Sequence, residues 1–181
     1  TVGCPHNKCT FCTIYKNGPR FRIRPVQEIM EDIDAASKIY GPDVKSLFFP
    51  AGNTIAMKTD DLAAICIYAR KVFPHLERIT VYGSSQYIHI KGRDGLKQLA
   101  EAGLNRIHVG LESGNDDVLR HVKKGVDAQR QIEAGQWVVA SGMELSLYVV
   151  LGLAGVVLTE AHADATADAL NRINPDFIRL R

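Results

Sequence analysis

The chain has 181 residues, enough for one domain with a hydrophobic core and too few for two comfortable ones. Apolar residues make up 46% and charged residues 23%, as in an ordinary globular protein, and the net charge of +2 is too small to predict a nucleic acid or a membrane as partner. The most apolar stretch, residues 145–158, is too short to span a bilayer and contains two glycines. We therefore expect no membrane association.

The first feature along the chain is a cluster of cysteines, Cys4, Cys9 and Cys12. A closed zinc site or a fully ligated cubane needs four protein ligands, so three thiolates on one loop favour a [4Fe–4S] cluster with one iron left open. A structural zinc site that adds His6 is the alternative. Clustered cysteines do not form a secreted disulfide framework, and thiolates that hold iron must stay reduced, so we expect a cytoplasmic location. Cys66 lies among apolar residues at helical spacing and is expected to be a buried hydrophobe.

After this loop, helix-like and strand-like segments alternate. Apolar residues at helical spacing predict the helices, with Pro25 in the first turn of one and Thr59 as the N-cap of another, and short apolar runs predict the strands. In chain order the expected elements are helix 25–40, strand 44–49, helix 60–73, strand 78–82, helix 92–102, strand 106–111, helices 116–121 and 127–140, strand 145–151, helix 160–173 and strand 176–180.

Strands that alternate with helices of ten or more residues predict an α/β protein with parallel strands and right-handed crossovers. The five visible strands, with a first strand expected before Thr1, predict a partial (βα)6 parallel barrel of the TIM-like kind. A flavodoxin-like open sheet is the alternative. We expect residues 1–181 to form one core domain that is a fragment of a longer chain.

Small and polar residues follow the expected strands directly, in the cysteine loop and in segments 51–54, 83–85, 112–114 and 152–155. The carboxyl ends of parallel strands meet at one rim, where a ligand can approach the backbone closely. The sequence therefore predicts that these five segments line one site.

Taken together, these motifs resemble the radical S-adenosylmethionine superfamily over residues 3–181. The Elp3-like and oxygen-independent coproporphyrinogen oxidase-like branch is the most similar, through residues 110–114 (GLESG). The usual loop of the family is CxxxCxxC, whereas here the first gap holds four residues. The resemblance implies that Cys4, Cys9 and Cys12 each ligate one iron of the cluster and that Phe11 packs near the adenine of S-adenosylmethionine.

The resemblance also implies the remaining cofactor contacts. Gly52 and Asn53 stand where a Gly-Gly-Glu-Pro motif binds the methionine amino group, with Asn53 in place of the acid. Glu112 matches a position that binds the ribose hydroxyls, and Lys124 matches a basic residue that pairs with the methionine carboxylate. Ser84 is a further candidate for ribose or amino contacts. Without the resemblance, Glu112 is explained as a helix-terminus carboxylate and Lys124 as a solvated lysine.

The implied function is a radical enzyme that cleaves S-adenosylmethionine reductively and abstracts hydrogen from an unknown substrate. It implies two cofactors, the [4Fe–4S] cluster and S-adenosylmethionine, and an electron donor such as flavodoxin or ferredoxin. The charge does not indicate nucleic acid, yet a tRNA substrate is not excluded by it. Two alternatives stay open: a zinc-stabilised α/β module, and a degenerate α/β binding module without catalysis.

Overall fold

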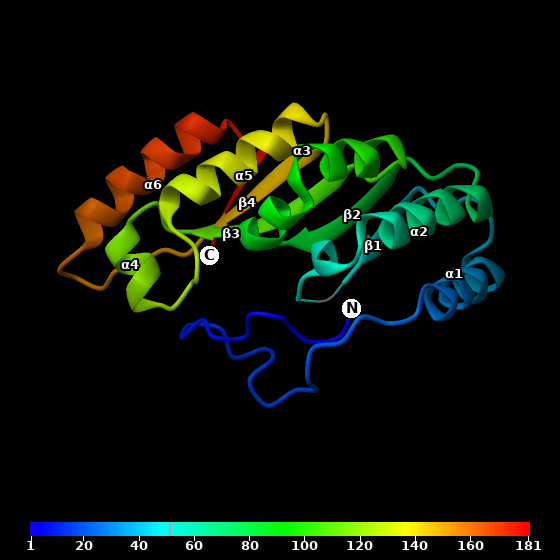
Figure 1. Ribbon diagram of the computed structural model, residues 1–181, viewed down its shortest axis with the longest axis horizontal. Coiled ribbons are helices and arrows are strands. Elements are labelled where there is room, and N and C mark those ends of the chain that lie inside the picture. Colours follow the sequence, from blue (N-terminus) through cyan, green and yellow to red (C-terminus); the bar gives the residue numbers. More distant parts are fainter. Residues whose placement is uncertain (51) are drawn as a thin grey trace.

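The computed structural model describes residues 1–50 and 52–181, and its centre is a five-stranded parallel sheet (Figure 1). The strands lie in chain order: β1 (Ser46–Phe49), β2 (Arg78–Gly83), β3 (Arg106–Glu112), β4 (Glu144–Val149) and β5 (Phe177–Leu180). This order confirms the α/β prediction. It contradicts the flavodoxin-like alternative, in which the strand order reverses within the sheet.

The long helices form one continuous layer over one face of the sheet (Figure 1). They are α1 (Val26–Tyr40), α2 (Thr59–Val72), α3 (Ser85–Glu101), α5 (Ala128–Ala140) and α6 (Thr159–Ile173), and each packs against the next. Right-handed crossovers place successive helices on the same face when the strands are added in one direction. The short elements η1 (Thr54–Ala56) and α4 (Asp116–His121) lie in connections that follow β1 and β3.

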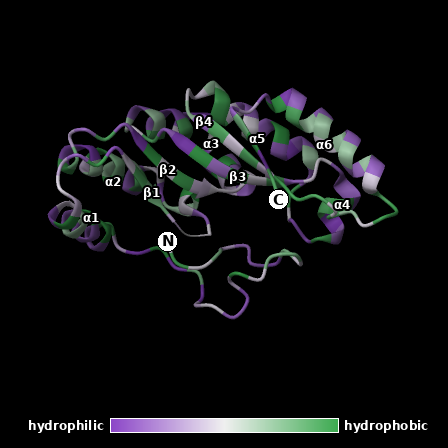
Figure 2. Cartoon of the chain, turned by 180° about the vertical axis from the view of Figure 1, so that it is seen from behind, coloured by the Kyte–Doolittle hydropathy of each residue, from purple (hydrophilic) through white to green (hydrophobic). Residues whose placement is uncertain are grey.

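The hydrophobic core lies between the strands and this helix layer. Figure 2 shows hydrophobic residues along the strands and hydrophilic stretches on the helices. Cys66 is fully buried in α2, and burial raises the pKa of its thiol to about 12, which confirms it as a buried hydrophobe. In the described part of the chain, no helix is both long and apolar enough to cross a membrane.

One predicted helix is incomplete and one predicted cap is wrong. Helix α3 begins at Ser85, but Gly92, with φ +68° and ψ 179°, breaks its helical geometry. The helix predicted over 92–102 is the part of α3 that follows this break, and the helical stretch 85–91 before it was missed. Helix α2 begins at Thr59 itself, so the capping position falls on Lys58. The prediction over 127–140 was nearly correct, since Asp127 caps α5 by accepting a hydrogen bond from the Arg130 amide.

The first 25 residues contain no long element. An isolated antiparallel bridge joins Val2 to Arg22 and closes this stretch into a loop that contains all three clustered cysteines. Figure 1 shows the loop on the side of the sheet away from α3, α5 and α6. The cysteine loop therefore faces the sheet surface that the helices leave open.

Candidate iron–sulfur and cofactor site

The cysteine loop holds three free, partly exposed thiols, those of Cys4, Cys9 and Cys12. The Cys12 amide donates to the Cys9 carbonyl at 3.4 Å, and the Asn7 amide donates to Cys4 Sγ at 3.4 Å. Asn7 takes a positive φ of 41° and its side chain donates to the Tyr15 carbonyl at 2.9 Å. Asn tolerates this backbone region better than most residues, so Asn7 supplies the sharp turn between the first two cysteines.

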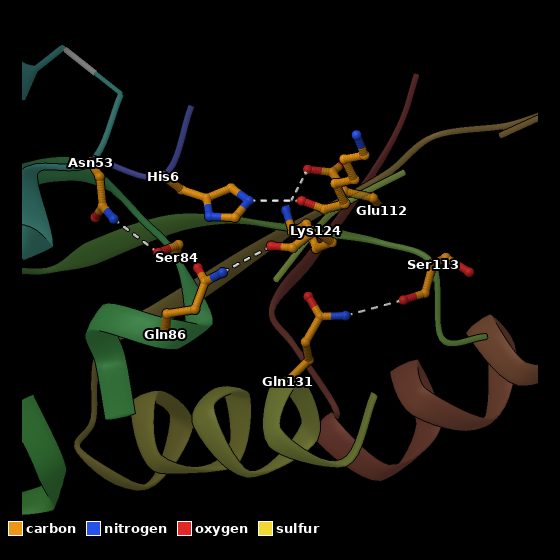
Figure 3. Close-up of polar contacts among 9 residues, drawn as sticks. His6, Asn53, Ser84, Gln86, Glu112, Ser113, Lys124 and Gln131 are labelled. Atoms are coloured by element: carbon orange, nitrogen blue, oxygen red, sulfur yellow. Dashed lines mark hydrogen bonds and ion pairs between the residues drawn. The ribbon is translucent and has the colours of Figure 1, made fainter. Parts of the chain in front are cut away.

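The loop is attached to the chain segment that follows α4. His6 Nε2 donates to the Lys123 carbonyl at 2.7 Å (Figure 3). The Thr10 amide donates to the Val122 carbonyl at 3.0 Å. A Cβ at Gly125 would lie 2.6 Å from the His6 ring, so a glycine is needed there for the ring to fit. These contacts fix the cysteine loop against the strand-end connections.

The His6 contact bears on the zinc alternative. Its Nε2 already donates to a backbone carbonyl, and within residues 1–50 and 52–181 no three His, Cys, Asp or Glu side chains are gathered closely enough to hold a single metal ion. In a cubane each thiolate binds a different iron, so its ligands stand further apart than those of one zinc ion. The bond from His6 Nε2 to the Lys123 carbonyl speaks against His6 as the fourth ligand of a zinc site through this nitrogen.

Gly52 and Asn53 bring the connection after β1 to the same loop. A Cβ at Gly52 would lie 2.6 Å from the Gly3 carbonyl oxygen and 2.9 Å from Cys4 Cβ, so only glycine permits this contact. Asn53 is buried and donates from Nδ2 to Ser84 Oγ at 2.8 Å, whereas its Oδ1 has no hydrogen-bond partner in the described chain. Such an orphaned buried oxygen suits a ligand donor such as an amino group. Ala51, the first residue of the predicted segment, lies outside the described residues.

Glu112 and Lys124 form an ion pair at the end of β3. Lys124 Nζ lies 3.0 Å from Glu112 Oε1, and the two side chains are only 9% and 11% exposed. The pair fills the space beside Gly110, where an added Cβ would lie 1.9 Å from Glu112 Oε1. Two residues placed twelve apart by sequence are therefore brought into contact, and Lys124 is not a solvated lysine.

Glu112 stands in a strained backbone position. Its φ is +63°, the Ser113 amide donates back to the Leu111 carbonyl at 2.8 Å, and the pairing with β4 shifts register between Gly110 and Glu112. A non-glycine residue at positive φ costs free energy and such positions cluster at functional sites. The turn is what directs the carboxylate toward Lys124.

The charge of the Lys124 ammonium affects the pKa of a cysteine in the loop. Burial raises the pKa of Cys9, and the Lys124 ammonium opposes that effect by favouring the thiolate. Burial also raises the pKa of Tyr15, and the thiolates of Cys4 and Cys12 raise it further. The ion pair, Tyr15 and the three cysteines therefore belong to one electrostatic neighbourhood. Phe11 is half-buried between the second and third cysteines.

A second polar layer supports the turn at Glu112. Ser113 Oγ lies 2.8 Å from His162 Nδ1, and Gln131 Nε2 donates to the Ser113 carbonyl at 3.2 Å. Gln86 Nε2 donates to the Lys124 carbonyl at 2.8 Å (Figure 3). Sequence reasoning missed Gln86, Gln131 and His162, because nothing local marks a helix residue that reaches a loop far away in the chain.

The open face of the sheet carries aromatic rings. Phe48, Tyr82, His108 and Tyr148 stand on four neighbouring strands with ring centroids 5.1–6.4 Å apart. The guanidinium carbon of Arg181 lies 5.3 Å from the Tyr148 ring centroid. Burial, together with the charges of Arg179 and Arg106, lowers the pKa of His108 to about 4, so this imidazole is neutral at physiological pH.

Direct contacts join three of the five predicted strand-end segments, since Gly52 lies against the cysteine loop and Asn53 bonds Ser84. Glu112 is linked to the loop through Lys124. The fifth segment, residues 152–155, makes no hydrogen bond to these four within the described part of the chain. It lies in an exposed connection after β4, followed by Val156 at 95% exposure. Its two glycines, Gly152 and Gly155, have positive φ and form the local turns of this connection.

Fold and site define a class: a one-sided parallel β/α sheet whose strand ends meet a loop of three cysteines. The profile of the Radical SAM superfamily matches residues 1–169, and the chain belongs to that family. Membership of this superfamily implies a [4Fe–4S] cluster and S-adenosylmethionine as cofactors.

Individual relatives agree with this assignment. The chain is 26% identical over 178 residues to the heme chaperone HemW of Bacillus subtilis, covering 93% of this chain and 45% of the relative. Coproporphyrinogen III oxidase (HemN) from Escherichia coli, a radical SAM enzyme, superposes with a TM-score of 0.76 at 18% identity, over 99% of this chain and 42% of that one. The methyltransferase TsrM from Kitasatospora setae, solved with cobalamin and a [4Fe–4S] cluster, gives 0.76 at 16% identity, over 98% and 35%.

At these identities the structural matches establish the fold alone. The chain spans less than half the length of the curated relatives it matches. The matches therefore do not identify the substrate or the partners of the whole protein.

Proposed function

We propose that the protein containing this domain is an enzyme that uses Cys4, Cys9 and Cys12 to hold a [4Fe–4S] cluster and binds S-adenosylmethionine at the adjacent strand ends. When bound, the cluster and S-adenosylmethionine supply reductive cleavage of a sulfonium carbon–sulfur bond and a 5′-deoxyadenosyl radical that abstracts hydrogen. The protein's own part is to bind, orient and exclude water.

Different strand-end residues would bind different parts of S-adenosylmethionine. The Lys124 ammonium is the only buried lysine charge beside the cysteine loop among the described residues, and it suits the methionine carboxylate. Glu112 suits the ribose hydroxyls as an acceptor. The unpartnered Oδ1 of Asn53 suits the methionine amino group, with Ser84 holding the Asn53 amide in place. Gly52 lets this segment approach Cys4. Phe11, half-buried on the loop, would pack against the adenine.

The observation that carries the proposal is the attachment of the cysteine loop to the Lys124 segment. The His6 ring donates to the Lys123 carbonyl and the Thr10 amide to the Val122 carbonyl, and the Lys124 ammonium acts on Cys9. A single ligand bound between the cysteine loop and the ion pair would contact both.

The aromatic face beyond this site is where we propose the substrate lies. Its rings and the guanidinium groups of Arg179 and Arg181 favour a molecule with planar and anionic parts. For the electron we propose a flavodoxin or ferredoxin, and for location the reducing cytoplasm, where thiolates persist.

The test is the iron and sulfide content of anaerobically reconstituted single variants. Cys4→Ala, Cys9→Ala and Cys12→Ala should each lose the cluster, because an iron without its thiolate is released. Cys66→Ala is the matched control and should keep full content, since Cys66 is buried in α2 away from the loop. Full iron and sulfide in Cys9→Ala would refute the assignment of ligands.

A further inference from the structure

A basic cleft lies on the outer side of the cysteine loop. It has a volume of about 610 Å³ and is formed by the loop, by α4, and by the segment that leads into α5. Its cationic side chains are Lys8, Arg120, Lys123 and Arg130. Lys124 is buried and faces the Glu112 carboxylate, whereas its neighbour Lys123 is exposed and lines this cleft.

Most of these cations are not neutralised. The two carboxylates in the cleft are engaged with backbone: Asp116 accepts from the Ala128 amide and Asp127 from the Arg130 amide, both at 2.8 Å. Arg120 pairs with Asp117. In the described chain no carboxylate oxygen lies within 4.0 Å of the charged groups of Lys8, Lys123 or Arg130. Three exposed charges thus converge on one concavity without a partner.

The floor of the cleft is the cluster loop itself. Lys8 directly precedes Cys9, and His6 lines the cleft while its ring holds the Lys123 carbonyl. A partner seated here would be separated from the cysteines only by the loop that carries them. Electron transfer falls steeply with distance, so such a surface is a favourable entry point for an electron.

We infer that the basic cleft docks a small acidic electron-transfer protein, which passes one electron from its reduced flavin or iron–sulfur group to the cluster. The inference rests on the proposed function. Complementary charge of this kind steers association and fixes orientation. Asp116 and Asp127 lie among the cations of the cleft. This mixed charge suits a protein surface, which carries lysines and arginines beside its carboxylates, better than the uniformly anionic backbone of an RNA.

Reversing the charge of two lysines in the cleft tests docking without changing the residues proposed to bind the cluster and S-adenosylmethionine. We take the double variant Lys8→Glu/Lys123→Glu, whose side chains make no hydrogen bond or ion pair with the described chain. The matched control is Lys71→Glu, an exposed lysine on α2. Helix α2 lies at the opposite end of the molecule from α4 (Figure 1). Binding of an acidic flavodoxin is measured by titration calorimetry at low and at physiological ionic strength. This measurement does not require the cluster.

The double variant should bind flavodoxin about tenfold or more weakly, with a smaller salt dependence, and Lys71→Glu should bind like the wild type. Stopped-flow reduction by flavodoxin hydroquinone should slow by a similar factor, while reduction by dithionite, a small donor that needs no docking, stays unchanged. Equal flavodoxin binding by both variants would overturn the inference, as would a cleft that binds a short RNA and no flavodoxin. Loss of dithionite reduction in the wild type would count against the proposed function instead.

Discussion

Lys124 connects the two halves of the site, because its ammonium contacts Glu112 and acts on Cys9. In the structure the ammonium is held by the Glu112 carboxylate at 3.0 Å. In the proposed complex the methionine carboxylate would share this donor with Glu112. Buried charges of this kind are stabilising only while they stay paired.

Replacing Lys124 by Gln should weaken S-adenosylmethionine binding roughly tenfold to a hundredfold, because a charge-assisted hydrogen bond contributes about 1.5–3 kcal/mol. The cluster should survive, since Lys124 is not a ligand. The measurement is a titration of S-adenosylmethionine followed by the electron paramagnetic resonance signal of the reduced cluster. Lys123→Gln is the control, because that side chain is exposed. Equal affinity in both variants would exclude Lys124 as the carboxylate partner.

The lowered pKa of His108 predicts how the stability of the fold depends on pH. Its pKa falls from an ordinary value near 6.5 to about 4 in the folded protein, chiefly through burial. Between these two pKa values His108 is protonated in the unfolded chain and neutral in the folded chain. The free energy of unfolding should therefore fall as the pH drops from about 6.5 toward 4, and His108 should not affect it above about pH 6.5. Between about pH 6.5 and pH 5 the loss should be up to about 2 kcal/mol. Urea unfolding of His108→Gln should lack this component, and an identical pH dependence in both proteins would contradict it.

At the scale of elements, Gly114 sets how closely α6 can approach the end of β3. A Cβ there would lie 2.1 Å from the Ala165 carbonyl oxygen in the helix backbone. Gly114→Ala should therefore cost about 3 kcal/mol of unfolding free energy and disturb the Ser113–His162 contact beside Glu112. Gly18→Ala, where the nearest atoms lie at 3.7 Å, is the control and should stay within about 0.5 kcal/mol. Chemical denaturation of both variants decides the point.

The elements also show where sequence reasoning works. Strand and helix periodicity located the five strands of the described chain, and the helices predicted over 116–121 and 127–140 begin within one residue of α4 and α5. In α3 the break at Gly92 was placed correctly, but the helical residues 85–91 before it were missed. That these residues form a helix depends on packing that no local pattern records.

The sequence also predicted some residues of the candidate site and missed others. The cysteines, Asn53, Glu112 and Lys124 were identifiable by motif, and the structure brings Glu112 and Lys124 into direct contact. His6 was considered as a zinc ligand in the alternative site, but its contact with the Lys123 carbonyl could not be foreseen. Gln86 carries no signal at all, since it contacts a carbonyl 38 residues away. Long-range side-chain to backbone contacts of this type are invisible to spacing and composition.

For the whole molecule, the consequence of the topology is an asymmetric sheet. One face is sealed by five helices and the other presents Phe48, Tyr82, His108 and Tyr148 beneath the cysteine loop. Sequential parallel order places all strand ends on one rim, so the loops of four connections can share one ligand. The exposed connection 152–155 is the exception, because its residues turn back on themselves.

The central claim is that this rim binds S-adenosylmethionine beside a cluster held by three cysteines and supports its cleavage. The most direct measurement is chromatography of the products after the anaerobically reconstituted protein is reduced with dithionite in the presence of S-adenosylmethionine. The account predicts 5′-deoxyadenosine and methionine in equal amounts, and none from the Cys9→Ala variant. Protein that carries its full iron and sulfide, is reduced, and yet releases no 5′-deoxyadenosine would contradict it.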